Sequence, residues 1–182
     1  MEQFAFGRQS APPYLSIADY VAPRDGGRID YLCMFVTTIG PGIRALAESW
    51  KHEGEYLRSH LLQVLALEGA EAFAELLHRK VREMWGIKDP PGLTRKDLFR
   101  ARYRGKRYSF GYPACPRLED QAKLFRLLDA ESAIGVNLTE GFMMEPEGSI
   151  SAIVLHHPEA RYFALSQVDG DRLTAEAEVA AS

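Results

Sequence analysis

The spacing of apolar residues predicts a long helical region in the middle of the chain. Between Ile43 and Trp85 there is no proline, and apolar residues recur every three or four positions. This pattern favours either one helix or two helices joined near Gly54, ended by Gly86 and the Pro-Pro-Gly segment that follows. The positions that keep the spacing are Leu57, Leu61, Val64, Leu65, Phe73, Leu76, Leu77, Val81 and Trp85.

Shorter elements are predicted on both sides of this region. The run 31–38 is dense in aromatic and β-branched residues and lies between turn formers, which is typical of a buried strand. Thr94 can cap a short helix that extends to Arg104, because Asp97 follows three residues later. The segment 118–128 has apolar residues at helical spacing and predicts a helix with one buried face. Prolines and glycines interrupt the first 28 residues, which predicts an irregular arm.

The last third of the chain has a different pattern. Three runs rich in β-formers, 137–142, 149–156 and 161–168, are separated by turn segments and predict an antiparallel meander. Helices followed by hairpin-connected strands favour an α+β fold, in which an antiparallel sheet is flanked by helices, over a Rossmann-type methyltransferase fold. No glycine fingerprint of a dinucleotide-binding fold occurs. Residues 169–182 are rich in alanine and glutamate, and we expect a frayed helical tail without chemistry.

Composition limits the classes of partner. With 182 residues and no low-complexity linker, the chain is expected to form a single domain, 1–182. Its 22 basic and 25 acidic residues are mixed along the chain, and the net charge of -3 argues against nucleic acid or an anionic membrane as a partner. The apolar runs are too short to span a membrane, and the N-terminus lacks a secretory segment. With only two cysteines, Cys33 and Cys115, a cytoplasmic location is the simplest interpretation.

Common catalytic and metal-binding patterns do not provide a site. Glu75 and His78 have the spacing of a di-iron motif, but the motif occurs once, so a pair on the protein surface is the better interpretation. His156 and His157 would point to opposite faces of a strand. No Gly-x-Ser-x-Gly motif is present, and neither cysteine has a histidine close in sequence. We therefore predict no metal ligands and no catalytic residues.

The segment 107–116, Arg-Tyr-Ser-Phe-Gly-Tyr-Pro-Ala-Cys-Pro, is the most informative part of the chain. Arg107 can bind a carboxylate through two parallel hydrogen bonds. Gly111 allows a ligand to approach the main chain closely, and Pro113 holds Tyr112 in an extended conformation. These properties suit a preformed loop that binds a ligand. They suit equally a rigid connector in which Arg107 makes an ordinary surface ion pair.

The pattern Arg-x-x-x-Gly-Tyr-Pro-Ala-Cys-Pro resembles the signature of the S-adenosylmethionine-binding reactivation domain of cobalamin-dependent methionine synthase. Other segments resemble that family in the same order, and the resemblance covers nearly the whole chain. Several ordered motifs are more specific than one short match. These segments are Phe4-Ala-Phe-Gly-Arg-Gln9, Leu15-Ser-Ile-Ala-Asp-Tyr-Val-Ala-Pro23, Ile29-Asp-Tyr31, Ala70-Glu-Ala-Phe-Ala-Glu75 with Leu77-His78, and Leu138-Thr-Glu140 through His157-Pro158.

The resemblance implies a set of ligand-binding residues. It implies that Arg107 binds the methionine carboxylate and that the main chain from Ser109 through Gly111 to Tyr112 contacts adenine and ribose, with Tyr112 near the transferred methyl group. An aromatic face suits the cationic sulfonium. By the same resemblance Glu71 acts on the polar end of the ligand, although a solvated polar stripe on a helix is an open alternative for it.

Two further candidates are Tyr162 and Phe163, which match a tyrosine-aromatic pair of the family at the start of the last predicted strand. Strand alternation would admit only one of them to a groove, and we prefer Tyr162. The chain departs from the family at Ser109, where alanine is common. In addition, an upstream helical part of the family's domain, with an aspartate that contacts the ligand, has no counterpart in this sequence.

The function that the resemblance implies is supply of the methyl group of S-adenosylmethionine for reductive remethylation of cob(II)alamin in methionine synthase, a methyltransferase. Cobalamin would be bound by a partner domain or subunit, and a flavodoxin-like protein would donate the electron. One alternative is an interaction module that docks on the cobalamin domain or the electron donor without binding the methyl donor. Another is a small-molecule binder that reuses the fold.

Overall fold

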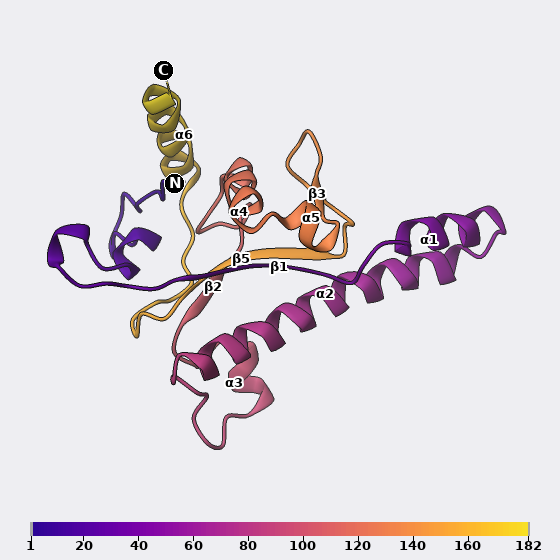
Figure 1. Ribbon diagram of the computed structural model, residues 1–182, viewed down its shortest axis with the longest axis horizontal. Helices are drawn as coiled ribbons and strands as arrows, with labels where there is room; N and C mark the ends of the chain where they lie inside the picture. Colours follow the sequence, from indigo (N-terminus) through magenta and orange to yellow (C-terminus); the bar gives the residue numbers. More distant parts are fainter. Residues whose placement is uncertain (1, 182) are drawn as a thin grey trace.

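A three-stranded antiparallel sheet lies at the centre of the protein (Figure 1). The computed structural model describes residues 2–181, apart from the side chains of residues 174 and 176–181. The strand order is β1 (Cys33–Thr38), β5 (Ser149–Leu155), β2 (Lys106–Tyr108). The central strand β5 therefore joins two strands that are far apart in the sequence.

The long helical region forms two antiparallel helices (Figure 1). Helix α1 (Ile43–His52) and helix α2 (Tyr56–Met84) pack against each other, and Gly54 between them has a φ of 84°. This left-handed conformation is easily adopted only by glycine, so it explains why the region breaks at this position. Of the two predicted alternatives, one helix or two helices joined near Gly54, the structure has the second.

Small residues bring α2 close to one face of the sheet. Ala66, Ala70 and Ala74 lie at four-residue spacing on α2 and are buried. Ala74 packs in a core cluster with Phe35 of β1 and Val154 of β5. Because four-residue spacing keeps side chains on one helix face, the alanines form a flat stripe that the sheet can approach.

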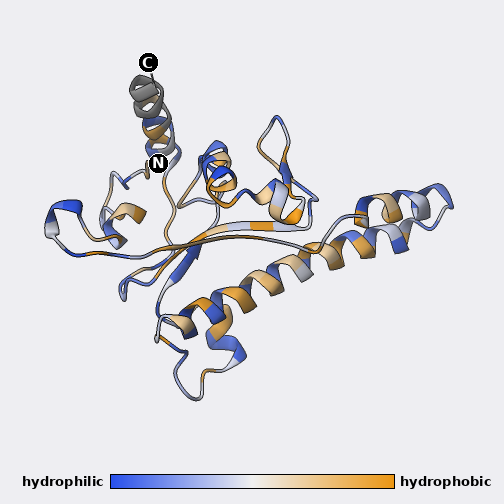
Figure 2. Ribbon diagram, in the orientation of Figure 1, coloured by the Kyte–Doolittle hydropathy of each residue, from blue (hydrophilic) through white to orange (hydrophobic). Residues whose placement is uncertain are grey.

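Hydrophobic residues occur along the whole of α2 (Figure 2), and those on the side away from the sheet are exposed. Its exposed fractions are high for large aliphatic side chains, for example 70% at Leu57 and 69% at Leu65. Leu61, Val64 and Leu76 are also exposed. The apolar surface of α2 is therefore wider than the part that the sheet covers.

Helix α4 (Gln121–Leu128) covers the second face of the sheet, and α5 (Ala130–Ile134) follows it. Leu124 of α4 is fully buried in a cluster with Ile153 and Leu155 of β5. Since Ala152 and Val154 face α2, the residues of β5 alternate between the two cores, as strand geometry requires. Helix α3 (Arg95–Phe99) begins at a capping box between Thr94 and Asp97, which confirms the predicted start. The predicted extension to Arg104 is wrong, because the helix ends at Phe99 and Ala101 has a left-handed φ of 49°.

The predicted meander is wrong. β3 (Asn137–Leu138) and β4 (Met144–Glu145) form a separate two-stranded ribbon, and residues 161–166 form no strand. Both edges of β5 are already paired, with β1 and β2, so the run 161–168 has no free edge of β5 to join. This run instead leads into helix α6 (Gln167–Ala181).

Helix α6 accounts for most of the tail that was expected to be a frayed helix. Its start is capped by Ser166 and Asp169, and the carboxylate of Asp169 also accepts a hydrogen bond from the main-chain amide of Ser10 at 3.0 Å. Leu173 is buried. The last residue, Ser182, lies outside the described residues.

Candidate ligand-binding site

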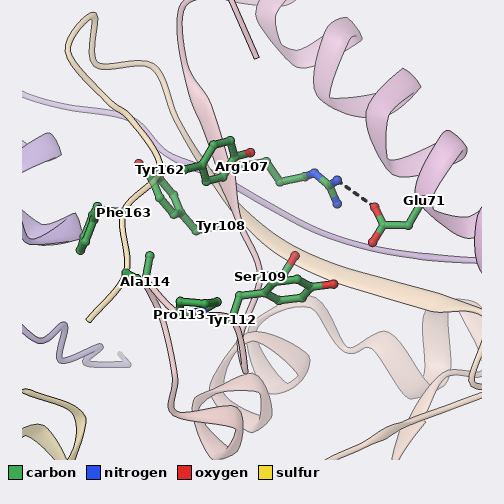
Figure 3. A pocket seen from close by; sticks show the side chains of 10 residues that line it. Glu71, Arg107, Tyr108, Ser109, Tyr112, Pro113, Ala114, Tyr162 and Phe163 are labelled. Carbon is green, nitrogen blue, oxygen red and sulfur yellow. Dashed lines mark hydrogen bonds and ion pairs between the residues drawn. The ribbon is translucent and has the colours of Figure 1, made fainter. Parts of the chain in front are cut away.

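A cavity of about 510 Å³ lies where β2, α2 and the segment before α6 meet (Figure 3). Six of the seven site residues predicted from the sequence line it, and Gly111 is the exception. The lining residues are Glu71, Arg107, Tyr108, Ser109, Tyr112, Pro113, Ala114, Tyr162, Phe163 and Ala164.

Neighbouring side chains of β2 point to opposite faces of the sheet. Tyr108 is buried in the core on the α4 side, and its hydroxyl donates a hydrogen bond to the main-chain oxygen of Arg161 at 3.0 Å. Arg107, the preceding residue, points to the opposite face, toward α2 (Figure 3). Its partner across the sheet is Val154, which faces α2 as well.

Arg107 bridges two carboxylates of α2. Its Nη2 donates to Oε2 of Glu71 and to Oε1 of Glu75, each at 2.9 Å. The two glutamates are one helical turn apart, so both reach the same guanidinium. Burial of Arg107 opposes its charge, but the hydrogen bonds and charges of the glutamates outweigh burial and raise its pKa above the ordinary value. Its Nε is buried and has no hydrogen-bond partner among residues 2–181.

Aromatic rings form the walls of the cavity. Tyr162 meets Tyr108 edge to face, with 5.6 Å between ring centroids, and burial raises the pKa of Tyr162. The amide of Leu165 donates to the main-chain oxygen of Pro113 at 2.9 Å, which ties the segment 162–164 to the loop after β2. Because no strand forms here, Tyr162 and Phe163 both line the cavity, and the prediction that only one could do so is wrong.

The sequence matches one family model over residues 3–179, nearly its full length. That model describes the activation domain of vitamin B12-dependent methionine synthase. The chain belongs to this activation-domain family.

The activation-domain chain is also similar to two individual proteins. It is 38% identical over 173 residues to methionine synthase of Mycobacterium tuberculosis (strain ATCC 25618 / H37Rv), covering 88% of this chain and 14% of that protein. It also matches a crystal structure of the MetH reactivation domain bound to AdoHcy with a TM-score of 0.85 and 33% identity, over 95% of this chain and 56% of that one. The predicted α+β class, as opposed to a Rossmann-type methyltransferase, is confirmed. The chain spans only part of each relative's length.

In this activation-domain chain Gly111 shapes the loop but does not line the cavity. Its φ is 82°, its amide donates to the oxygen of Cys115 at 2.8 Å, and an added Cβ would lie 3.1 Å from Cδ1 of Leu118. Glycine is therefore required by the turn itself. The alanines beside Glu71 likewise serve helix-sheet packing, since Ala70 and Ala74 are buried against the sheet.

The expectation that Glu75 and His78 form a surface pair is wrong for the histidine. His78 is fully buried, and burial together with the charges of Arg82, Arg107 and Lys106 lowers its pKa to about 3. Arg82, one helical turn after His78, is also buried, with an exposed fraction of 1%. The apolar pattern did not reveal these inward-facing polar residues.

Four further residues line the cavity, Tyr108, Pro113, Ala114 and Ala164. The first three belong to the segment 107–116 that was predicted to bind a ligand, although none of them was named as a site residue. Ala164 was missed, and its position directly after Phe163 was the only signal for it.

The activation-domain site offers no nucleophilic thiolate. Burial, with a smaller effect of Asp120, raises the pKa of Cys115 to about 12, and burial raises that of Cys33 as well. Within the described residues, no three histidine, cysteine, aspartate or glutamate side chains gather to hold a metal ion. No helix in the same part of the chain combines the length and apolarity needed to cross a membrane.

Proposed function

We propose that the cavity binds S-adenosylmethionine and that the chain presents its methyl group for reductive remethylation of cob(II)alamin in methionine synthase. The observation that carries this proposal is the ion pair between Arg107 and Glu71 at the cavity, which offers a cation and a carboxylate to the amino-acid end of a ligand. Membership of the activation-domain family supports it, as does a relative solved with AdoHcy bound.

The residues present fit this ligand. A cavity of about 510 Å³ is within the range of about 300–1,000 Å³ that small-molecule sites occupy. The Nε of Arg107 lacks a partner among the described residues, and its Nη2 donates to two acceptors, so the guanidinium has N–H groups left to donate to a further carboxylate. Glu71 can bind the ammonium group. The rings of Tyr112 and Tyr162, 58% and 51% exposed, suit a sulfonium cation.

The loop after β2 would hold the rest of the ligand. In this proposal the main chain from Ser109 to Tyr112 contacts adenine and ribose, with Gly111 supplying the turn that presents it, and Tyr112 lies near the methyl group. Phe163 completes the apolar wall. The serine side chain at position 109 is compatible with contacts made through the main chain.

The chain's contribution to the reaction is to position the methyl group. When bound to its own domain or subunit, cobalamin supplies the nucleophile after it receives an electron from a flavodoxin-like donor. No side chain of this chain needs to act as a general acid or base, and we assign no catalytic residue. We further propose a single domain, the C-terminal portion of the family's activation domain, that functions in the cytoplasm without nucleic acid or membrane.

Titration calorimetry with S-adenosylmethionine tests the proposal. Arg107→Ala should weaken binding at least ten-fold, because charge-assisted hydrogen bonds contribute about 1.5–3 kcal/mol. Arg126→Ala is the matched control, since Arg126 pairs with Glu2 on the surface away from the cavity. The absence of heat at millimolar ligand, or equal binding by Arg107→Ala, would contradict the proposal.

The exposed leucines of α2 favour a second function, which is docking on the cobalamin domain or the electron donor without binding the methyl donor. This function predicts no heat with S-adenosylmethionine. It also predicts that Leu61→Glu weakens co-sedimentation with the cobalamin domain.

A further inference from the structure

Glu75 contacts Arg107 but does not line the cavity. Its Oε1 accepts from Nη2 of Arg107 at 2.9 Å, and its Oε2 lies 3.4 Å from the hydroxyl of Tyr103, which donates to it. Glu71 accepts from the same Nη2 and does line the cavity. One guanidinium nitrogen is therefore shared by one carboxylate at the cavity and one outside it.

We propose that Glu75 is a positioning residue, which holds and neutralises Arg107 so that Glu71 is available to the ammonium group of the ligand. This inference rests on the proposed function. With Glu71 as its only carboxylate partner, the buried guanidinium would form a closed pair, and a ligand would have to break that pair to bind either member. With Glu75 present, Arg107 keeps a carboxylate partner when Glu71 turns to the ligand.

The charges of the cluster agree with this role. Arg107 and the two glutamates carry a net charge of about -1 when all three are ionised, whereas Arg107 with Glu71 alone would be neutral. S-adenosylmethionine carries a sulfonium, an ammonium and a carboxylate, and hence a net charge of about +1. Glu75 thus supplies the negative charge that makes the cluster complementary to the ligand.

Tyr103 fixes the orientation of Glu75. The side chain of Tyr103 is buried, and the guanidinium of Arg82 lies over the Tyr103 ring, 3.8 Å from its centroid. Arg82 is itself held by hydrogen bonds of 2.8–3.0 Å to both carboxylate oxygens of Asp89. Burial, followed by the charge of Glu75, raises the pKa of Tyr103, so its hydroxyl remains a donor. One oxygen of Glu75 is thereby occupied, and the other faces Arg107.

Two measurements on the whole chain test the inference. The first is calorimetric titration with S-adenosylmethionine, in which Glu75→Gln should bind about ten-fold more weakly than the unmodified protein. Glu83→Gln, which removes an exposed ion pair with Arg79 on the same helix, should bind equally well. The second is the NMR signal of the Arg107 Nε–H group, which should broaden or shift in Glu75→Gln and not in Glu83→Gln. A merely structural role of Glu75 would not change that signal selectively.

Tyr103→Phe provides a variant that keeps the charge of Glu75 and removes only its donor, and we expect a loss of about two- to three-fold. Unchanged binding by Glu75→Gln, or weaker binding with an unchanged Arg107 signal, would overturn the inference. If the unmodified chain binds the ligand and Arg107→Ala does not, while Glu75→Gln binds normally, only the role of Glu75 fails. If the unmodified chain does not bind, the proposed function fails with it.

Discussion

At the residue scale, burial forces His78 to remain neutral. Neither ring nitrogen has a hydrogen-bond partner among residues 2–181, and the ring meets Tyr103 edge to face at 5.4 Å between centroids. Arg82, Lys106 and Arg107 surround it with positive charge, which adds to the effect of burial on its pKa. A proton on this imidazole would have no compensating contact, so protonation is coupled to unfolding.

This coupling predicts acid sensitivity from one residue. The pKa of His78 is about 3 in the folded protein and 6.5 ordinarily, so between these values the unfolded chain binds a proton that the folded chain does not. The free energy of unfolding should therefore decrease as the pH is lowered below 6.5, by up to about 1.4 kcal/mol per pH unit. Urea unfolding at pH 7.5, 6 and 5 measures the slope. His78→Leu should reduce this slope, whereas His60→Gln, a change at an exposed histidine, should not. Equal slopes in the unmodified protein and both variants would disprove the coupling.

At the scale of elements, the position of α2 against the sheet sets the geometry of the site. The alanine stripe determines how closely the helix approaches, and the glutamates that hold Arg107 lie on the same helix. Ala74 is fully buried and lies between Glu71 and Glu75 in the sequence. A larger side chain at this position must push the helix and both carboxylates away from β2.

Ala74→Leu should consequently damage stability and binding together. Overpacking a close contact costs about 1–3 kcal/mol, and misplaced carboxylates should weaken the affinity for S-adenosylmethionine. Ala72→Leu is the matched control, because Ala72 is exposed on the same helix. Chemical unfolding and calorimetry measure the two effects. An Ala74→Leu protein with normal stability would show that the helix-sheet contact tolerates added volume.

At the scale of the whole molecule, the cavity joins α2, β2 and the segment before α6, which are distant in the sequence. A ligand that contacts all three should stabilise the folded chain by mass action. At a concentration one hundred times the dissociation constant, the gain is about 2.7 kcal/mol, or roughly 5–10 °C in the melting temperature of a chain of this size. Differential scanning fluorimetry measures this shift. With ten-fold weaker binding, Arg107→Ala should gain only about 1.4 kcal/mol at the same ligand concentration, roughly half the shift of the unmodified chain.

The sequence predicted those features of the fold that depend on residues close together in the chain, and it missed those that depend on distant residues. Helical periodicity and Gly54 are local, and they correctly predicted α1 and α2. Strand β2 was missed because three residues are too few to establish an alternating pattern. His78 was predicted to lie on the surface, because helical spacing cannot reveal that the ring of Tyr103 packs against it and that Lys106 and Arg107 of β2 lie nearby.

The site residues show the same distinction. The motif beginning at Arg107 identified the loop, and resemblance to a family added Glu71 and the aromatic pair at 162–163. The contact between Glu75 and Arg107 was not predicted, because the two residues are 32 positions apart in the sequence. The absence of a strand at 161–166, which admits both aromatic rings to the cavity, depended equally on how the edges of β5 are paired.

The continuity of α2 has a mechanical consequence. The helix has 29 residues, about 43 Å at 1.5 Å per residue, and contains no proline that would allow a hinge. The exposed leucines 57, 61 and 65 belong to its first half, whereas the carboxylates that hold Arg107 belong to its second half. A rigid rod transmits displacement along its axis. A partner that binds these leucines and shifts the helix along its axis would therefore move Glu71 and Glu75 by the same distance. Such a shift would change their contacts with Arg107 and with the proposed ligand.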